Sequence, residues 1–331
     1  MKLIDFENHF YAPDTIEAME ARQGYPKYDP AADLIHWTRD ISMPQRVLLP
    51  KLLDVGKNRL ALMDELGIQS AVISTAQGVE DIAPVEGIEL ARKTNDVVYR
   101  MTQEYPRRYL GSAILPVRDV GAAVCELERC VRELGFVAWH THSNYGDASP
   151  EGERFLPLFK KAAELGVYIY LHPALPLSDA CAGYGFTFAG PGLGFTVDTM
   201  TTVLKLIVCG VFDEVPETRL LLGHLGEAIP FLLDRIDNRL NFLPNDRLKN
   251  REKPSYYFKN NIMVTTSGNM SPAAFRCTMD VLGIENILFG SDYPFEDAGD
   301  MVKFVEALQI SETERGLLYY KNAERLGIYA G

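Results

Sequence analysis

Short apolar runs rich in β-branched residues alternate with longer amphipathic stretches along most of the 331-residue chain. Runs of this kind, apolar on both faces, are typical of strands in a parallel sheet that is covered on both sides. The pattern predicts eight strands, at residues 2–6, 70–75, 109–115, 136–140, 167–172, 218–224, 261–266 and 286–292.

The amphipathic stretches between these runs predict helices. Residues 58–67, 122–135 and 155–166 each end in glycine just before the next strand, which is a common signal for the end of a helix. Eight strand–helix units predict an α/β fold: a closed (β/α)8 TIM barrel that forms a single domain over residues 1–331. A doubly wound open sheet is the alternative, but the first strand is followed by ENHFYAPD, without the glycine-rich phosphate turn of that fold.

Two segments are longer than a minimal barrel requires. Residues 11–57 are rich in proline, tyrosine and charge, and residues 181–195 are rich in glycine. Both follow the carboxyl ends of predicted strands, the first and the fifth, where active-site loops of such barrels lie. We therefore expect loop insertions over the functional face.

Composition excludes several classes of protein. The chain is 47% hydrophobic and 24% charged, which is globular, and its net charge of −12 disfavours nucleic acid or an anionic membrane as a partner. It contains no apolar run long enough to span a bilayer. Its five cysteines are scattered and lack a C-x-x-C pair, so we expect free thiols in a reducing cytoplasm.

Ionisable residues stand at the carboxyl ends of four predicted strands: Glu7 and His9, then His172, His224 and Asp292. Parallel strands bring these ends together, and charged groups there are costly to bury unless they are paired or bind a metal. We expect Glu7, His9, His172 and Asp292 to ligate one divalent ion, Zn²⁺ or Mn²⁺.

Three histidines at strand ends are not among the expected ligands: His224, His140 and His142. Glu227 follows His224 by three residues, so it can hydrogen-bond the imidazole and make His224 a general acid or base; otherwise Glu227 only places charge at a helix start. His140 and His142 end the fourth strand, where they either line the pocket or add a ligand.

Several motifs together resemble one protein family. They are Glu7-Asn8-His9, LHP at 171–173, GHLGE at 223–227 and FGSDYPFE at 289–296. This set resembles the amidohydrolase superfamily, in particular its aminocarboxymuconate-semialdehyde decarboxylase and dihydroxybenzoate decarboxylase branch, over nearly the whole chain. Hydrolases of the superfamily usually begin with H-x-H and often carry a lysine on the fourth strand. Because this chain has glutamate first and FVAWHTH there, the resemblance implies a single-metal decarboxylase.

The resemblance also implies a reaction. It is the metal-dependent, non-oxidative decarboxylation of a hydroxylated aromatic acid of the 2-hydroxybenzoate type, with Asp292 as the proton donor to the ring and His224 with Glu227 at a ring hydroxyl. The alternatives are a metal-dependent hydrolase of a lactone or amide, with Asp292 as the base, and a binding protein without catalysis.

Substrate contacts are expected from three further residues. Arg235 matches a substrate-side arginine of related decarboxylases and implies contact across a subunit interface, in a homodimer or homotetramer. Arg59 is a second candidate of this kind, and for both arginines a surface salt bridge is the alternative. Phe295, three residues after Asp292, can wall an aromatic ring, as can the loop that holds Tyr184, Phe186 and Phe188.

Overall fold

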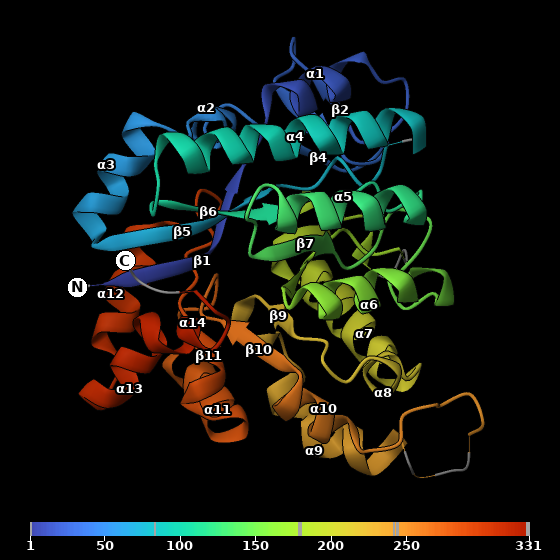
Figure 1. Ribbon diagram of the computed structural model, residues 1–331, viewed down its shortest axis with the longest axis vertical. Coiled ribbons are helices and arrows are strands. Elements are labelled where there is room, and N and C mark those ends of the chain that lie inside the picture. The colour runs from blue at the N-terminus through green and yellow to red at the C-terminus, as the bar shows by residue number, and fades with distance from the viewer. Residues whose placement is uncertain (1, 83, 178–180, 241, 243–244, 329–331) are drawn as a thin grey trace.

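The computed structural model describes residues 2–82, 84–177, 181–240, 242 and 245–328. Eight strands form one parallel sheet whose neighbours follow the order of the chain (Figure 1). They are β1 (Leu3–Phe10), β5 (Ile68–Thr75), β6 (Tyr109–Ala113), β7 (Ala138–His142), β8 (Tyr168–His172), β9 (Leu220–Leu222), β10 (Ile262–Thr265) and β11 (Ile287–Leu288). A doubly wound sheet would reverse its strand order midway, so that alternative is excluded.

Backbone hydrogen bonds close the sheet between its first strand and the segment after its last. The amide of His9 donates to the carbonyl of Tyr293 (2.7 Å), and the amide of Asp292 donates to the carbonyl of Glu7 (2.9 Å). The predicted (β/α)8 barrel is therefore confirmed, and its closing seam runs through three of the predicted ligands, Glu7, His9 and Asp292.

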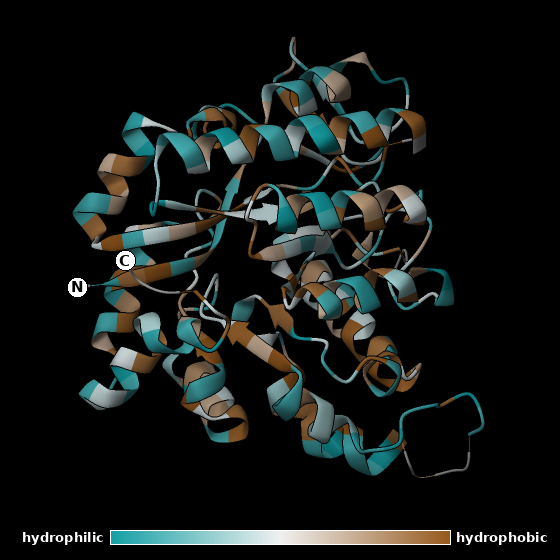
Figure 2. Cartoon of the chain, in the orientation of Figure 1, coloured by the Kyte–Doolittle hydropathy of each residue, from teal (hydrophilic) through white to brown (hydrophobic). Residues whose placement is uncertain are grey.

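Helices surround the barrel (Figure 1). Figure 2 shows hydrophilic and hydrophobic residues mixed along these helices, as expected when one helix face packs on a sheet. The longer helices are α3 (Lys57–Leu66), α4 (Pro84–Glu104), α5 (Val120–Arg132), α6 (Leu156–Leu165), α7 (Gly194–Val208), α9 (Ile229–Leu240), α11 (Pro272–Leu282) and α12 (Ala298–Ala307). The shorter ones are α1 (Pro13–Ala21), α2 (Leu48–Leu53), α8 (Val211–Glu214), α10 (Pro254–Asn260), α13 (Glu312–Gly316) and α14 (Asn322–Glu324). Every described helix is too short or too polar to cross a membrane.

The insertion after β1 has structure of its own. It contains α1, α2 and a small antiparallel sheet of β2 (Lys27–Asp29), β3 (Leu34–His36) and β4 (Ser42–Pro44). Buried Ile16, Met19, Ile35 and Leu52 form its core, together with Tyr11. The predicted loop insertion is thus a folded cap, because it carries enough apolar side chains to bury.

Inside the barrel, apolar side chains fill the lower layer. The barrel strands contribute Ile4, Phe6, Val72, Ala138, Tyr168, Tyr170, Leu221 and Leu288 to this buried cluster. Above it, the pairing of β1 with β5 is irregular: Asp5 and Asn8, three residues apart, pair with Ala71 and Ile73, which are two apart. This bulge shifts the alternation of β1, so that Glu7 and His9 face the interior above Ile4 and Phe6.

Some predicted strand limits were wrong. The strand predicted at 2–6 continues to Phe10, since its polar residues still pair with β5. The strands predicted at 218–224 and 286–292 shrink to Leu220–Leu222 and Ile287–Leu288. The backbone leaves the extended region before His224 and Asp292, whose φ angles are 54° and 58°.

Candidate active site

A cavity of about 520 Å³ opens at the carboxyl end of the barrel. The side chains of His172, His224, Asp292 and Phe295 line it, and each follows or ends a barrel strand. Glu227 lines it too, from the turn before α9. The structure therefore brings together five of the side chains that the sequence singled out.

Glu7, His9, His172 and Asp292 form one compact group at the base of this cavity. Each offers one ligand atom, and these atoms lie within 4.8 Å of one another. Nε2 of His9 is 3.1 Å from Oδ1 of Asp292 and 3.9 Å from Oε1 of Glu7. These three atoms are buried and have no hydrogen-bond partner among the described residues. Two carboxylates and two imidazoles that converge in this way fit a divalent ion.

Hydrogen bonds fix the orientation of these side chains. The hydroxyl of Thr265 donates to Oε2 of Glu7 (2.9 Å), which leaves Oε1 facing the group. Nδ1 of His172 donates to the carbonyl of Pro173 (2.8 Å), so Nε2 keeps its lone pair. Such outer contacts are what hold metal ligands in place.

The protonation states of these ligands depend on burial and on the contacts that they make with one another. Burial alone would lower the pKa of His9, but its contacts with Asp292 and Glu7 outweigh burial and raise the pKa to about 9. Burial would raise the pKa of Asp292, yet the neighbouring His224 and His9 hold it below its usual value. Burial lowers the pKa of His172 to about 3, so its imidazole is neutral. In the metal-free chain a proton on His9 thus balances the carboxylates where an ion would bind.

His224 and Glu227 form a second functional pair. Nδ1 of His224 is 2.9 Å from Oε1 of Glu227, whose other oxygen accepts a hydrogen bond from Thr196 (2.7 Å). Nε2 of His224 is 3.9 Å from Oδ2 of Asp292. Burial opposes protonation of His224, but Glu227 and Asp292 raise its pKa well above the usual value. The pair is therefore a stronger base than a free imidazole, and it lies beside the predicted proton donor.

The backbone around this pair is strained. His224, Leu225 and Glu227 all have φ between 54° and 59°, in the left-handed region that costs roughly 1–3 kcal/mol for each such residue. Gly268 packs against them, and a Cβ there would lie 2.7 Å from Cδ2 of His224. The turn after β9 is thus shaped to hold His224 against Glu227.

Arg59 lies outside the cavity lining. It is 1% exposed, and its guanidinium donates to the side-chain oxygen of Asn8 and to the carbonyl oxygens of His9, Lys51 and Asp54. It joins the insertion to the outer side of β1.

Arg235 also lies outside the cavity lining. It is exposed on α9 and has no hydrogen-bond or ion-pair partner among the described residues. Phe231, one turn earlier on the same face, is 82% exposed.

Only some of the predicted aromatic residues line the cavity. The ring of Phe295 lines the cavity, with its centroid 5.5 Å from that of His9, and Phe186 lines it as well. Tyr184 and Phe188 are 78% and 39% exposed and are absent from the lining.

Sequence reasoning missed two parts of the site. Trp37, Met43 and Leu48 of the insertion line the cavity, but no local pattern ties them to the barrel. Glu80, in the loop after β5, is 2% exposed and lies 2.7 Å from Nδ1 of His142. The alternation His140-Thr141-His142 was the available sequence signal for the pair of Glu80 and His142.

Comparisons with known proteins agree with this geometry. A family model described as amidohydrolase matches residues 4–326. A gamma-resorcylate decarboxylase from Rhodococcus jostii (strain RHA1) is 37% identical over 84% of this chain and 89% of its own. The structure of a 2,6-dihydroxybenzoate decarboxylase in complex with 2,6-dihydroxybenzoate matches with a TM-score of 0.84 and 31% identity, covering 98% of each chain. A dihydroxybenzoic acid decarboxylase from Polaromonas sp. JS666, with bound manganese and the inhibitor 2-nitroresorcinol, matches with a TM-score of 0.86 and 29% identity, over 98% of this chain and 96% of that one.

The family model spans nearly the whole barrel, and the relatives share its length as well as its fold. The resemblance drawn from the sequence motifs is therefore confirmed. The chain belongs to the amidohydrolase family, in the branch that contains the gamma-resorcylate decarboxylases.

Proposed function

We propose that this chain is a divalent-metal-dependent, non-oxidative decarboxylase of a hydroxylated aromatic acid of the 2-hydroxybenzoate type. The observation that carries this proposal is the buried group of Glu7, His9, His172 and Asp292 beneath a cavity flanked by an acid–base pair. Relatives named for decarboxylation of dihydroxybenzoates support the substrate class.

We propose that the four-residue group holds one ion, Mn²⁺ rather than Zn²⁺. The two carboxylates suit manganese, and the Polaromonas relative contains it. When bound, the ion supplies Lewis acidity toward the carboxylate and ortho oxygen of a substrate.

The chemistry requires a proton on the ring before carbon dioxide leaves, because direct loss would leave an unstabilised aryl carbanion. His224 accepts the proton of the ortho hydroxyl at Nε2, and Asp292, 3.9 Å away, receives that proton and delivers it to the carbon that bears the carboxylate. The ring is then a ketone-like tautomer. When the carbon–carbon bond breaks, its electrons restore aromaticity, carbon dioxide departs, and the phenolate takes a proton from solvent through His224.

The cavity walls orient the ring and keep water out. Phe295 lies over the ligand group, and Trp37, Met43 and Leu48 of the insertion face it from the folded cap. Apolar contacts on a flat ring hold the carboxylate toward the ligands, which places the reacting carbon near Asp292.

We propose that Arg235 contacts the substrate bound in the cavity of a neighbouring subunit, in a homodimer or homotetramer. No lysine or arginine is among the described residues that line the cavity, although the substrate is anionic. Arg235 is exposed beside Phe231 on α9, a face suited to contact with a second copy. Replacement of Arg235 by glutamine should raise KM more than it lowers kcat. Light scattering should show that the protein is a dimer or tetramer, and a monomer would contradict this role of Arg235.

We propose that Arg59 holds the insertion against β1 and does not contact substrate, because its guanidinium already donates to backbone carbonyls of both. We also propose a cytoplasmic location, since all five cysteines are free thiols.

A panel of 2-hydroxybenzoates and simple lactones tests the proposed reaction. We expect one carbon dioxide for each phenol formed, and no turnover by the Asp292→Asn variant. Lactone opening without release of carbon dioxide would contradict the decarboxylase proposal and indicate a metal-dependent hydrolase.

A further inference from the structure

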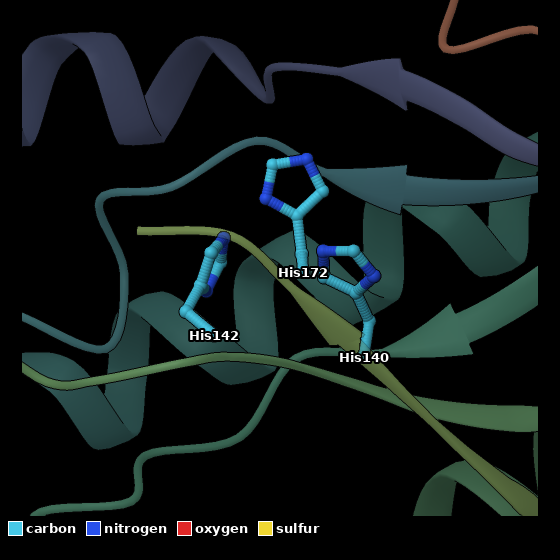
Figure 3. Close-up of side chains that lie close together, drawn as sticks. All are labelled: His140, His142 and His172. Carbon is cyan, nitrogen blue, oxygen red and sulfur yellow. The ribbon is translucent and has the colours of Figure 1, made fainter. Parts of the chain in front are cut away.

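Three histidines lie together beside the proposed ligand group. His140 and His142 are two residues apart on β7 and so point to the same side, and His172 is the register partner of His142 on β8. Their ring centroids lie 5.3–5.5 Å from one another and so form a triangle, and Figure 3 shows the three side chains gathered at one place. One nitrogen from each lies within 4.8 Å of the others.

Two of these rings present buried nitrogens without partners. His140 and His142 are each 1% exposed, and Nε2 of both has no hydrogen-bond partner among the described residues. An unpaired polar atom in this setting costs roughly 1–3 kcal/mol. Nothing in the proposed decarboxylation uses either ring, so the cost has no explanation in that reaction.

The outer contacts match those of a metal ligand. Nδ1 of His142 is 2.7 Å from Oε2 of Glu80, and Glu80 also accepts a hydrogen bond from Thr141 (2.8 Å). With the shared proton on Nδ1, Nε2 presents its lone pair to the cluster. A carboxylate behind an imidazole is the usual support of a histidine that binds zinc.

We propose that His140, His142 and His172 form a second metal site, selective for a borderline ion such as Zn²⁺. Three neutral imidazoles bind zinc in preference to manganese, whereas the two carboxylates of the first group suit manganese. Because Nδ1 of His172 is bound to a carbonyl, its Nε2 serves one ion at a time. The two sites therefore compete for His172, and zinc at the second site withdraws a ligand from the first.

Zinc binding by a chain without the first site tests this proposal. The variant Glu7→Gln/Asp292→Asn removes both carboxylates but keeps His9, so the part of its zinc affinity that depends on His140 and His142, measured by calorimetry with ZnCl₂, reports the second site. We expect about one zinc per chain. Adding His142→Asn or His140→Asn should weaken zinc binding by more than the ~10–100-fold that loss of an outer partner causes. The matched control is His36→Asn, on the small antiparallel sheet, which should change nothing.

Three outcomes would overturn the proposal: no zinc bound by the folded carboxylate variant, equal affinity after loss of His140 and His142, or a zinc absorption edge without imidazole signals. If the double variant does not fold, Asp292→Asn is titrated with and without His140→Asn, a change that removes a ring of the second site only. The readout needs no turnover, so failure of the decarboxylase proposal would leave it standing. In active, manganese-loaded chain, excess zinc should inhibit, and His142→Asn should relieve that inhibition.

Discussion

Replacement of Glu227 by glutamine tests the acid–base pair. The side chain keeps its shape, so the hydrogen bonds to His224 and Thr196 can persist while the charge is lost. A hydrogen bond to a charged group contributes roughly 1.5–3 kcal/mol and a neutral one about 1 kcal/mol. The imidazolium of His224 should thus lose about 1–2 kcal/mol of stabilisation, which corresponds to about one pKa unit and about tenfold in rate.

The sign of the pH effect follows from the role of His224. It accepts the hydroxyl proton in its neutral form, which exists above its pKa, and Glu227 raises that pKa. In Glu227→Gln the acidic limb of the kcat profile should therefore move about one unit toward lower pH, while the plateau falls about tenfold. Stopped-flow measurement of phenol formation across pH reports both.

Thr196→Val is the control for this prediction. It removes only the hydroxyl that donates to Glu227 and keeps the carboxylate, so the plateau should stay within about threefold of wild type. An unchanged acidic limb in Glu227→Gln, with kcat within about twofold of wild type, would refute the coupling of Glu227 to His224.

Three further predictions concern stability and metal binding. Arg59→Met leaves buried and partly buried acceptors without a donor and should lower the free energy of unfolding in urea by about 3 kcal/mol. The control Arg132→Met, which removes exposed ion pairs with Glu128 and Glu164, should cost under about 1 kcal/mol, and equal losses would deny Arg59 its structural role. Because the pKa of His9 is about 9 in the metal-free chain, its proton must leave when an ion binds, so Mn²⁺ affinity should fall about tenfold per pH unit below pH 9; calorimetry that finds no released proton would contradict this. Thr265→Val frees Oε2 of Glu7 and should weaken Mn²⁺ binding by ~10–100-fold in equilibrium dialysis, and unchanged affinity would show that the hydroxyl does not orient this ligand.

Much of the fold could be predicted because the barrel strands are apolar on both faces. All eight predicted runs overlap a strand of the barrel, and glycine ends α3 and α6 as expected, with Gly67 and Gly166 in the left-handed conformation. The small antiparallel sheet of the insertion was not predicted. Its strands are three residues long, too short to show an alternation.

The limits of the strands were least predictable at the site itself. A run of apolar residues stops where Glu7 and His9 begin, yet β1 continues, because the interior of the barrel supplies polar neighbours at that depth. The bulge that turns both side chains inward leaves no trace in the residue pattern. Glu80 could not be assigned, since its partner His142 lies 62 residues later in the chain.

We propose that the group of Glu7, His9, His172 and Asp292 holds an ion on which ring decarboxylation depends. The most direct measurement follows 2,6-dihydroxybenzoate in D₂O by NMR, first with metal-stripped chain and then after one equivalent of Mn²⁺. We predict no turnover by the stripped chain. With manganese, one carbon dioxide should leave per product, and one deuterium should enter at the vacated carbon. Equal turnover without metal, or a product that keeps its carboxylate, would contradict metal-dependent decarboxylation by this group.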